Sequence, residues 1–166
     1  MTSRIARQTP IALAALFILI GQLFCNAADF EKPQYYELRV YSTRSTGQQQ
    51  WISDYWQNAA IPAYNRMGIQ PIGVFTELQD SATNKIYVLI PCDSLEEFAA
   101  IPAKLAADAD YQKAAAEYLS APKSDAAYEH FESSLLVAFD GMKHLTMPPA
   151  DKKPNIFELR TYTSSS

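Results

Sequence analysis

Apolar positions change their spacing several times along the chain, and each spacing predicts an element. Residues 34–42 are rich in Tyr, Val and Leu and alternate in polarity, which is typical of a β-strand. Between residues 48 and 67 the apolar positions recur at helical intervals, which predicts an amphipathic helix that Gly68 can end. Pro62 should kink this helix because it lacks an amide donor and crowds the preceding turn.

A hairpin is predicted next. Residues 69–78 and 85–91 are apolar enough to form strands, and the polar residues 79–84 between them predict the turn. The sequence therefore indicates that these two strands pair in antiparallel fashion.

A second helical region follows the hairpin. Asp93 with Glu96, and Ser94 with Glu97, both have the spacing of a capping box, which marks a helix start. This helix should bend at Pro102, which lies within it.

The Ala-rich stretch 111–119 predicts a further helical piece, and residues 128–139 predict a long final strand. The whole order is β-α-β-β-α-β. That order predicts an α+β, ferredoxin-like fold, with an antiparallel sheet and both helices on one face.

One stretch of sequence occurs twice. Residues 36–42, Tyr-Glu-Leu-Arg-Val-Tyr-Ser, recur at 157–163 as Phe-Glu-Leu-Arg-Thr-Tyr-Thr, and a Lys-Pro pair precedes each copy at a constant offset of 121 residues. An offset of this length indicates a duplicated domain rather than a short-repeat array. We therefore expect one whole domain followed by the first strand of a truncated second repeat.

Three segments together resemble the NIPSNAP family. They are Glu-Leu-Arg-x-Tyr at 37–41, Gly-Ile-Gln-Pro-Ile-Gly-Val-Phe at 68–75, and Ser-Ser-Leu-Leu at 133–136. The resemblance covers about residues 35–139, and the restart at Phe157 matches the two-copy form of that family. It implies half of a dimeric α+β barrel, in which the uncovered sheet faces of two units pack on each other. Related barrels include cofactor-independent monooxygenases and haem-binding enzymes.

The N-terminus has the pattern of a signal peptide. Arg4 and Arg7 precede an apolar run that ends near Phe24, and Cys25 and Ala27 are small residues at the −3 and −1 positions of a cleavage site. The run is shorter than the roughly 20 residues that a spanning helix needs. We expect cleavage after Ala27, export to the periplasm or beyond the cell, and no stable membrane anchor. An uncleaved anchor or a misplaced start is the alternative.

These observations predict the organisation of the chain. It comprises a signal peptide at 1–27, an N-terminal lead at 28–33, the NIPSNAP-like domain at 34–141, a linker at 142–154 and the first strand of the second repeat at 155–166.

Charge and cysteine content narrow the possible partners. The formal net charge is −4 and becomes −6 when cleavage removes Arg4 and Arg7, so a nucleic acid or an anionic membrane is not expected as a partner. Cleavage also removes Cys25 and leaves Cys92 alone, which excludes an intrachain disulfide. Cys92 is then expected to act as a small buried apolar residue.

Alternation along the first and last strands predicts which residues share a face. On the first strand Tyr36, Leu38 and Val40 are expected to face the helices. On the last strand the corresponding set is Phe131, Ser133, Leu135, Val137 and Phe139. The remaining residues should line the cavity that a partner sheet would close. The candidates are Tyr35, Glu37, Arg39, Tyr41, His130 and Glu132.

These candidates allow three interpretations. A His beside a carboxylate can transfer protons near neutral pH. Glu37 and Arg39 could instead satisfy each other as a structural ion pair, which is the favoured role, or clamp a ligand.

No metal site is predicted, because His130 is the only histidine of the domain. No cofactor is predicted either. Haem is kept as an alternative, because it needs only one axial His. The G-x-S-x-G, Walker and G-x-G-x-x-G motifs do not occur in the sequence.

The leading hypothesis is an exported NIPSNAP-like domain that binds a small, partly apolar molecule in its inter-sheet cavity or serves in assembly. It would work as a homodimer or with the missing second repeat, and no catalytic residue is assigned. The alternative is a cofactor-independent monooxygenase-like or isomerase-like enzyme that uses Tyr41, Arg39 and His130. An open pocket that reaches His130 would favour the enzyme.

Overall fold

The computed structural model describes residues 32–78, 84–147 and 156–164. The predicted signal peptide lies outside these residues. Within them, no helix is both long and apolar enough to cross a membrane.

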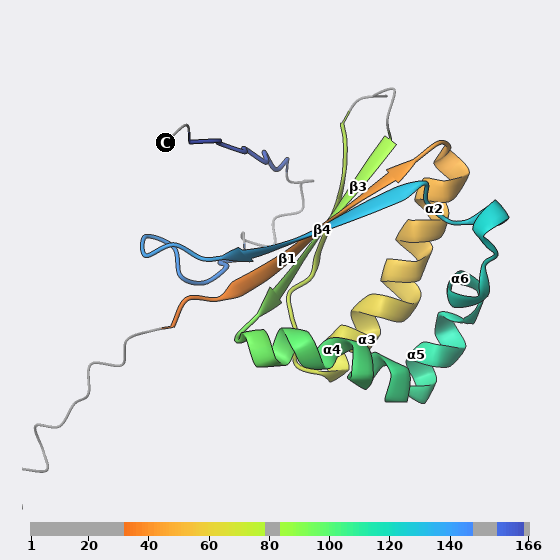
Figure 1. The fold of residues 1–166 in the computed structure, drawn as a ribbon, viewed down its shortest axis with the longest axis horizontal. Helices are drawn as coiled ribbons and strands as arrows, with labels where there is room; N and C mark the ends of the chain where they lie inside the picture. Colours follow the sequence, from red (N-terminus) through yellow and green to blue (C-terminus); the bar gives the residue numbers. More distant parts are fainter. Residues whose placement is uncertain (1–31, 79–83, 148–155, 165–166) are drawn as a thin grey trace, which may run out of the picture. The chain divides into compact units, whose positions relative to one another are not determined.

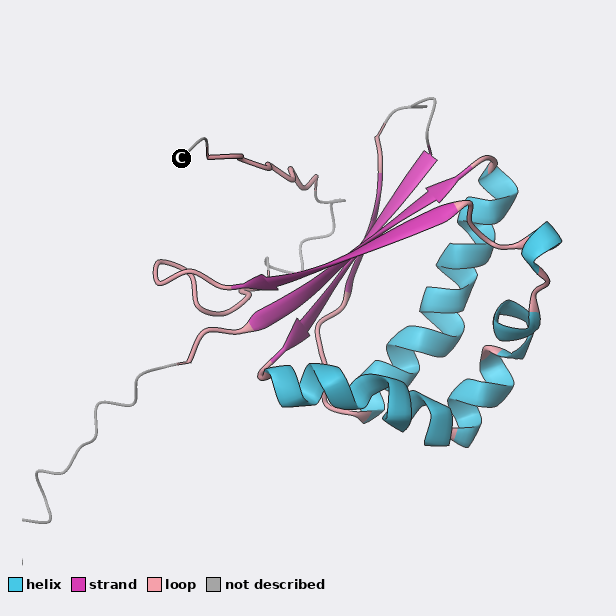
Figure 2. Ribbon diagram, in the orientation of Figure 1, coloured by secondary structure: helices cyan, strands magenta, loops and turns pink. Residues whose placement is uncertain are grey.

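Four strands form a single antiparallel sheet (Figures 1 and 2). They are β1 (Tyr35–Thr43), β2 (Gly73–Thr76), β3 (Asn84–Cys92) and β4 (His130–Val137). The order across the sheet is β2-β3-β1-β4, and every neighbouring pair is antiparallel. The first and last strands of the chain are therefore neighbours, as the predicted topology requires.

The helical segments gather on one side of this sheet (Figure 2). They are α2 (Thr46–Tyr55), the π-helix η1 (Trp56–Ala60), α3 (Ile61–Arg66), α4 (Leu95–Ala107), α5 (Ala109–Ala114), α6 (Ala116–Ser120) and the 3-10 helix η2 (Lys123–Asp125). The predicted α+β, ferredoxin-like fold is confirmed.

The disturbance predicted at Pro62 takes the form of a π-helical turn. Ile61 donates its amide to the carbonyl of Trp56, five residues earlier, between α2 and α3. Pro62 has no amide for the carbonyl of Asn58, and its ring needs room beside that carbonyl. The wider π turn supplies the room without ending the helix.

The second helical region starts at the predicted cap. Ser94 Oγ accepts a hydrogen bond from the Glu97 amide at 3.1 Å, and Glu97 Oε2 accepts one from the Asp93 amide at 2.8 Å. The first bond satisfies an amide of the first turn that has no helical partner, and the second ties the residue before the N-cap to the helix. Of the two capping boxes that the sequence allows, the structure uses the one that begins at Ser94.

Several boundaries differ from the prediction. The strand predicted at 69–78 is only β2, and the helix predicted at 111–119 is divided at Ala115 into α5 and α6. Residues 156–164 form no strand in the described chain. A strand needs a hydrogen-bonded neighbour, so the second repeat stays a prediction.

The face assignment for the first strand was wrong. Glu37, Arg39 and Tyr41 lie opposite Ile90, Val88 and Ile86 of β3, which are fully buried. Directly paired residues share a face, so the helices cover the face that carries Glu37, Arg39 and Tyr41. The other face carries Tyr36, Leu38 and Val40.

The assignment for the last strand was correct. Ser133 reaches Glu37 with its hydroxyl, and Phe131 pairs with Tyr41. His130 and Glu132 therefore lie on the opposite face from Glu37. The six residues predicted to line one cavity are divided between the two faces of the sheet.

The core fills the space between the helices and the sheet. Its largest fully buried side chains come from both layers: Trp56, Tyr64, Ile52, Ile86, Ile90, Val88 and Cys92. Cys92 is buried as predicted, and burial together with the nearby Glu97 raises the pKa of its thiol to about 11. It is therefore a neutral thiol at physiological pH.

Candidate functional site

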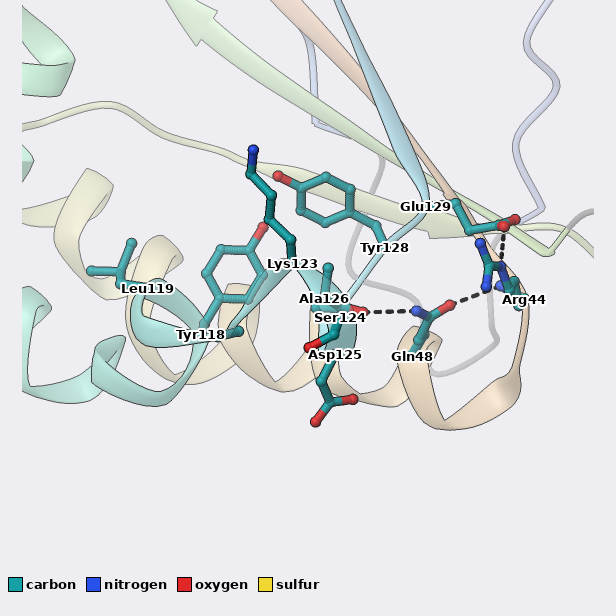
Figure 3. A pocket seen from close by; sticks show the side chains of 12 residues that line it. Arg44, Gln48, Tyr118, Leu119, Lys123, Ser124, Asp125, Ala126, Tyr128 and Glu129 are labelled. Atoms are coloured by element: carbon teal, nitrogen blue, oxygen red, sulfur yellow. Dashed lines mark hydrogen bonds and ion pairs between the residues drawn. The ribbon is translucent and has the colours of Figure 1, made fainter.

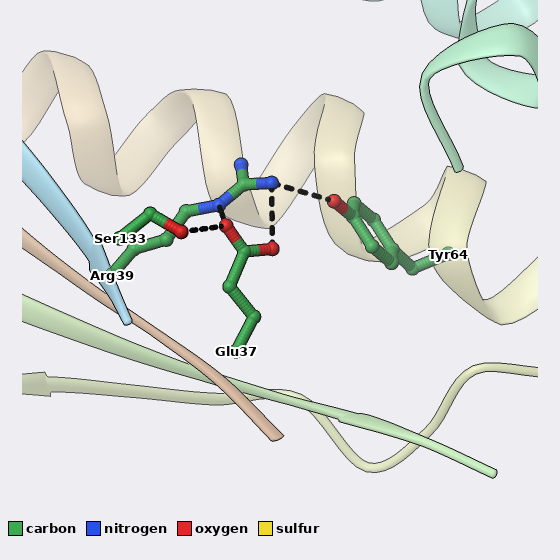
Figure 4. Close-up of polar contacts among 4 residues, drawn as sticks. All are labelled: Glu37, Arg39, Tyr64 and Ser133. Atoms are coloured by element: carbon green, nitrogen blue, oxygen red, sulfur yellow. Dashed lines mark hydrogen bonds and ion pairs between the residues drawn. The ribbon is translucent and has the colours of Figure 1, made fainter. Parts of the chain in front are cut away.

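A buried ion pair on β1 lies at the centre of the polar contacts under the helices (Figure 4). Arg39 Nε lies 2.7 Å from Glu37 Oε1, and Arg39 Nη2 lies 2.9 Å from Glu37 Oε2. Glu37 is 3% exposed, and the Arg39 side chain is 22% exposed. This two-bond geometry is the strongest arrangement that an arginine and a carboxylate can make.

Neighbouring elements complete the bonding of this pair. Ser133 Oγ of β4 donates to Glu37 Oε1 at 2.7 Å, and Arg39 Nη2 donates to the Tyr64 hydroxyl of α3 at 3.3 Å. The guanidinium carbon lies 5.6 Å from the centre of the Trp56 ring, within the range of a cation–π contact. The pair thus ties β1 to β4, η1 and α3.

The electrostatics of this cluster favour a structural role. Burial acts to lower the pKa of Arg39, but the hydrogen bonds to Glu37 and the neighbouring charges hold it above its ordinary value. Burial raises the pKa of Tyr64 to about 12, although the charge of Arg39 partly offsets this effect. Neither group exchanges a proton near neutral pH, so the cluster is a satisfied charge pair rather than an acid–base site.

A set of aromatic rings extends from this pair toward α6. The Tyr41 ring lies 5.5 Å from Tyr128 and 5.7 Å from Phe131, and Tyr55 stacks on Tyr118 at 3.8 Å. Burial raises the pKa of Tyr41, Tyr55 and Tyr118. These phenols therefore stay neutral and able to donate hydrogen bonds.

This aromatic set was not predicted from the sequence. Tyr111, whose hydroxyl lies 2.9 Å from that of Tyr55, belongs to it together with Tyr118 and Tyr128. The seven-residue spacing of Tyr111 and Tyr118 places both on one helical face, and that spacing was the available signal.

His130 and Glu132 form a separate pair on the opposite face. His130 Nε2 lies 3.4 Å from Glu132 Oε1, and both side chains are exposed. An exposed pair of this kind contributes at most about 1 kcal/mol to stability. His130 therefore does not meet Arg39 and Tyr41 within the protomer.

A pocket of about 600 Å³ lies beside the aromatic set, at the start of β4 (Figure 3). Its walls come from the segment before α2, from α2 itself, from α6, from η2 and from the residues leading into β4. The residues that line the pocket are Arg44, Gln48, Tyr118, Leu119, Ala121, Lys123, Ser124, Asp125, Ala126, Ala127, Tyr128 and Glu129. His130 is not among these residues. The enzyme hypothesis calls for an open pocket that reaches His130, and this pocket does not reach that residue.

Across residues 32–78, 84–147 and 156–164, no group of three or more His, Cys, Asp or Glu side chains is placed to hold a metal ion.

The raised pKa of Tyr64 predicts how stability depends on pH. A tyrosine in the unfolded chain ionises near pH 10, whereas Tyr64 in the folded chain ionises near 12. The free energy of unfolding should be unaffected by this group below pH 10 and should fall as the pH rises from 10 toward 12.

Tyr64→Phe should make that fall shallower, by up to about 1.4 kcal/mol per pH unit. Denaturant titrations between pH 9 and 12 measure it, and Tyr162→Phe, at a residue 82% exposed, is the control. Parallel curves for Tyr64→Phe and the wild type would contradict the burial of this hydroxyl.

The comparisons with known proteins agree with this fold. The NIPSNAP family model matches residues 36–139. A NIPSNAP family protein from Agrobacterium tumefaciens str. C58 superposes with a TM-score of 0.52 at 18% identity, over 68% of this chain and 91% of that one.

An uncharacterized NIPSNAP-like domain protein from Burkholderia xenovorans superposes with a TM-score of 0.51 at 18% identity, over 71% of this chain and 97% of that one. At these identities the likeness shows the fold alone. No curated protein matches the chain in sequence. The family match extends over most of the folded domain, and the chain belongs to the NIPSNAP family.

Proposed function

We propose that this domain is one half of an α+β barrel and assembles, through the sheet face opposite the helices, with a second NIPSNAP sheet. The observation that carries the proposal is the apolar character of this uncovered face. By strand register its apolar residues are Tyr36, Leu38, Val40, Phe75, Tyr87, Leu89 and Leu136. A helix or a second sheet normally covers such a face in a soluble protein.

The free edge of the sheet supports the same proposal. Within the described residues β4 pairs with β1 on one side only, and its Leu136 side chain, which lies on the uncovered face, is 44% exposed. Monomeric proteins seldom leave contiguous apolar patches or long apolar edge strands in water. A second sheet packed over the uncovered face would remove Leu136 from solvent.

The repeated segment indicates what the partner sheet is made of. The ring of Phe157, the first residue of the second copy, lies 5.0 Å from that of Phe75 on the uncovered face. Arg160 Nη2 lies 2.7 Å from Glu158 Oε2, which repeats the ion pair between Arg39 and Glu37. The partner is therefore a NIPSNAP sheet, supplied either by a second copy of the chain or by a second repeat.

The inter-sheet space would suit binding better than acid–base catalysis. Its walls on this side would include Leu38, Val40 and Leu89. Of the six residues predicted from sequence, only His130 and Glu132, which form an exposed pair, lie on this face. A small, partly apolar molecule is the ligand that such walls would accept. No observation favours the monooxygenase-like or isomerase-like alternative, because Arg39 and Tyr41 lie under the helices while His130 is exposed on the other face.

Assembly can be tested by placing a charge on the uncovered face. Sedimentation velocity of the chain from Ala28 onward should show a dimer or larger species at micromolar concentration. Leu38→Lys should yield folded monomer, because a lysine at the centre of an apolar interface loses its hydration without gaining a partner.

Ala103→Lys, on the exposed surface of α4, is the matched control and should assemble like the wild type. Circular dichroism of both variants checks that they fold. A wild type that stays monomeric over the whole micromolar range would refute the proposal.

We also propose that the chain is exported, on the evidence of the signal-peptide pattern at residues 1–27. When the whole chain is expressed in a bacterium, protein recovered from the periplasm should have the intact mass of a chain that begins at Ala28. Recovery of the full-length mass, in the cytoplasm or the membrane fraction, would argue against export.

A further inference from the structure

We propose that the pocket beside β4 binds a small aromatic molecule that carries one carboxylate group. This pocket lies on the helix side of the sheet, away from the uncovered face. The proposal therefore goes beyond barrel assembly and does not depend on it. Its volume of about 600 Å³ falls within the range of sites that hold small molecules.

Two fixed aromatic rings form one wall of the pocket (Figure 3). Tyr118 and Tyr128 both line it, with ring centres 6.5 Å apart. Tyr118 is held by its stack on Tyr55, with 11° between the ring planes, and Tyr128 is held by edge contacts with Tyr41 and Phe131. Rings that are already fixed bind a flat molecule without a further loss of side-chain freedom.

Hydrogen bonds hold the rim of the pocket in shape. Gln48 Nε2 donates to the Ala126 carbonyl at 2.7 Å, and Gln48 Oε1 accepts from the Arg44 amide at 2.8 Å. The Arg44 side chain forms an ion pair with Glu129 across the same rim. These contacts join α2 to the residues that lead into β4, so the pocket is preformed.

The charges of the lining select the ligand. Because Arg44 and Glu129 neutralise each other, Lys123 and Asp125 are the lining charges that have no ion-pair partner in the described parts of the chain. Lys123 can bind a carboxylate through its ammonium group, whereas Asp125 disfavours a ligand with more than one negative charge. An aromatic monoanion matches both the rings and the lysine.

Four probes of similar size, which differ in charge or in the ring, can test this assignment with the chain from Ala28 onward. They are 3-phenylpropanoate, its neutral amide, 3-cyclohexylpropanoate and L-phenylalanine. Titrations followed by NMR should give saturable shifts for 3-phenylpropanoate at the pocket residues. The amide and the cyclohexyl acid should each bind about tenfold more weakly, since one loses the ion pair and the other the ring stacking.

Two variants separate the contributions of charge and ring. Lys123→Gln should weaken 3-phenylpropanoate about tenfold and leave the amide unchanged. Tyr128→Leu should weaken both probes. Lys104→Gln, at an exposed lysine of α4 outside the pocket, is the matched control and should bind like the wild type.

Three results would overturn the assignment. They are no saturable binding of any probe, an unchanged affinity in folded Lys123→Gln protein, and tighter binding of L-phenylalanine than of 3-phenylpropanoate. The last result would indicate a zwitterion site that uses Asp125. The monomeric Leu38→Lys variant should bind 3-phenylpropanoate normally, so a failure of assembly and a failure of ligand binding can be told apart.

Discussion

The ion pair between Glu37 and Arg39 is the constraint on which the rest of the structure depends. β1 is a central strand with neighbours on both sides, so one choice of face decides the position of every side chain that it carries. Placing the pair under the helices requires that all its hydrogen-bonding groups find partners, because a half-satisfied buried charge is strongly destabilising. Ser133 and Tyr64 provide hydrogen bonds to the pair, and the Trp56 ring makes a cation–π contact with the guanidinium.

Both proposed functional surfaces follow from this choice. With Arg39 and Tyr41 turned inward, Leu38 and Val40 are left on the face that the described helices do not cover, where a second sheet can bind. Tyr41 also begins the aromatic set that fixes the ring of Tyr128 at the pocket. The inward placement of a single ion pair therefore leaves an apolar face on one side of the sheet and goes with a preformed pocket on the other.

Much of the fold could be predicted from sequence, because local signals and topology agree. The strand and helix order, the cap at Ser94, the disturbance at Pro62 and the family all follow from short patterns. The faces of β1 could not be predicted by counting apolar residues, since a neutralised ion pair is stable in the interior and both faces carry apolar groups. The pocket could not be predicted either, because segments from Arg44 to Glu129 meet there only in the folded chain.

A double-mutant cycle on the ion pair tests this account most directly. Glu37→Leu and Arg39→Met should each lower the free energy of unfolding by about 3 kcal/mol, since each leaves one buried charge without its partner. The double variant should be no less stable than either single variant, which corresponds to a coupling energy of about 3 kcal/mol or more. A coupling energy below about 0.5 kcal/mol, as expected for an exposed pair, would contradict the inward placement of Glu37 and Arg39.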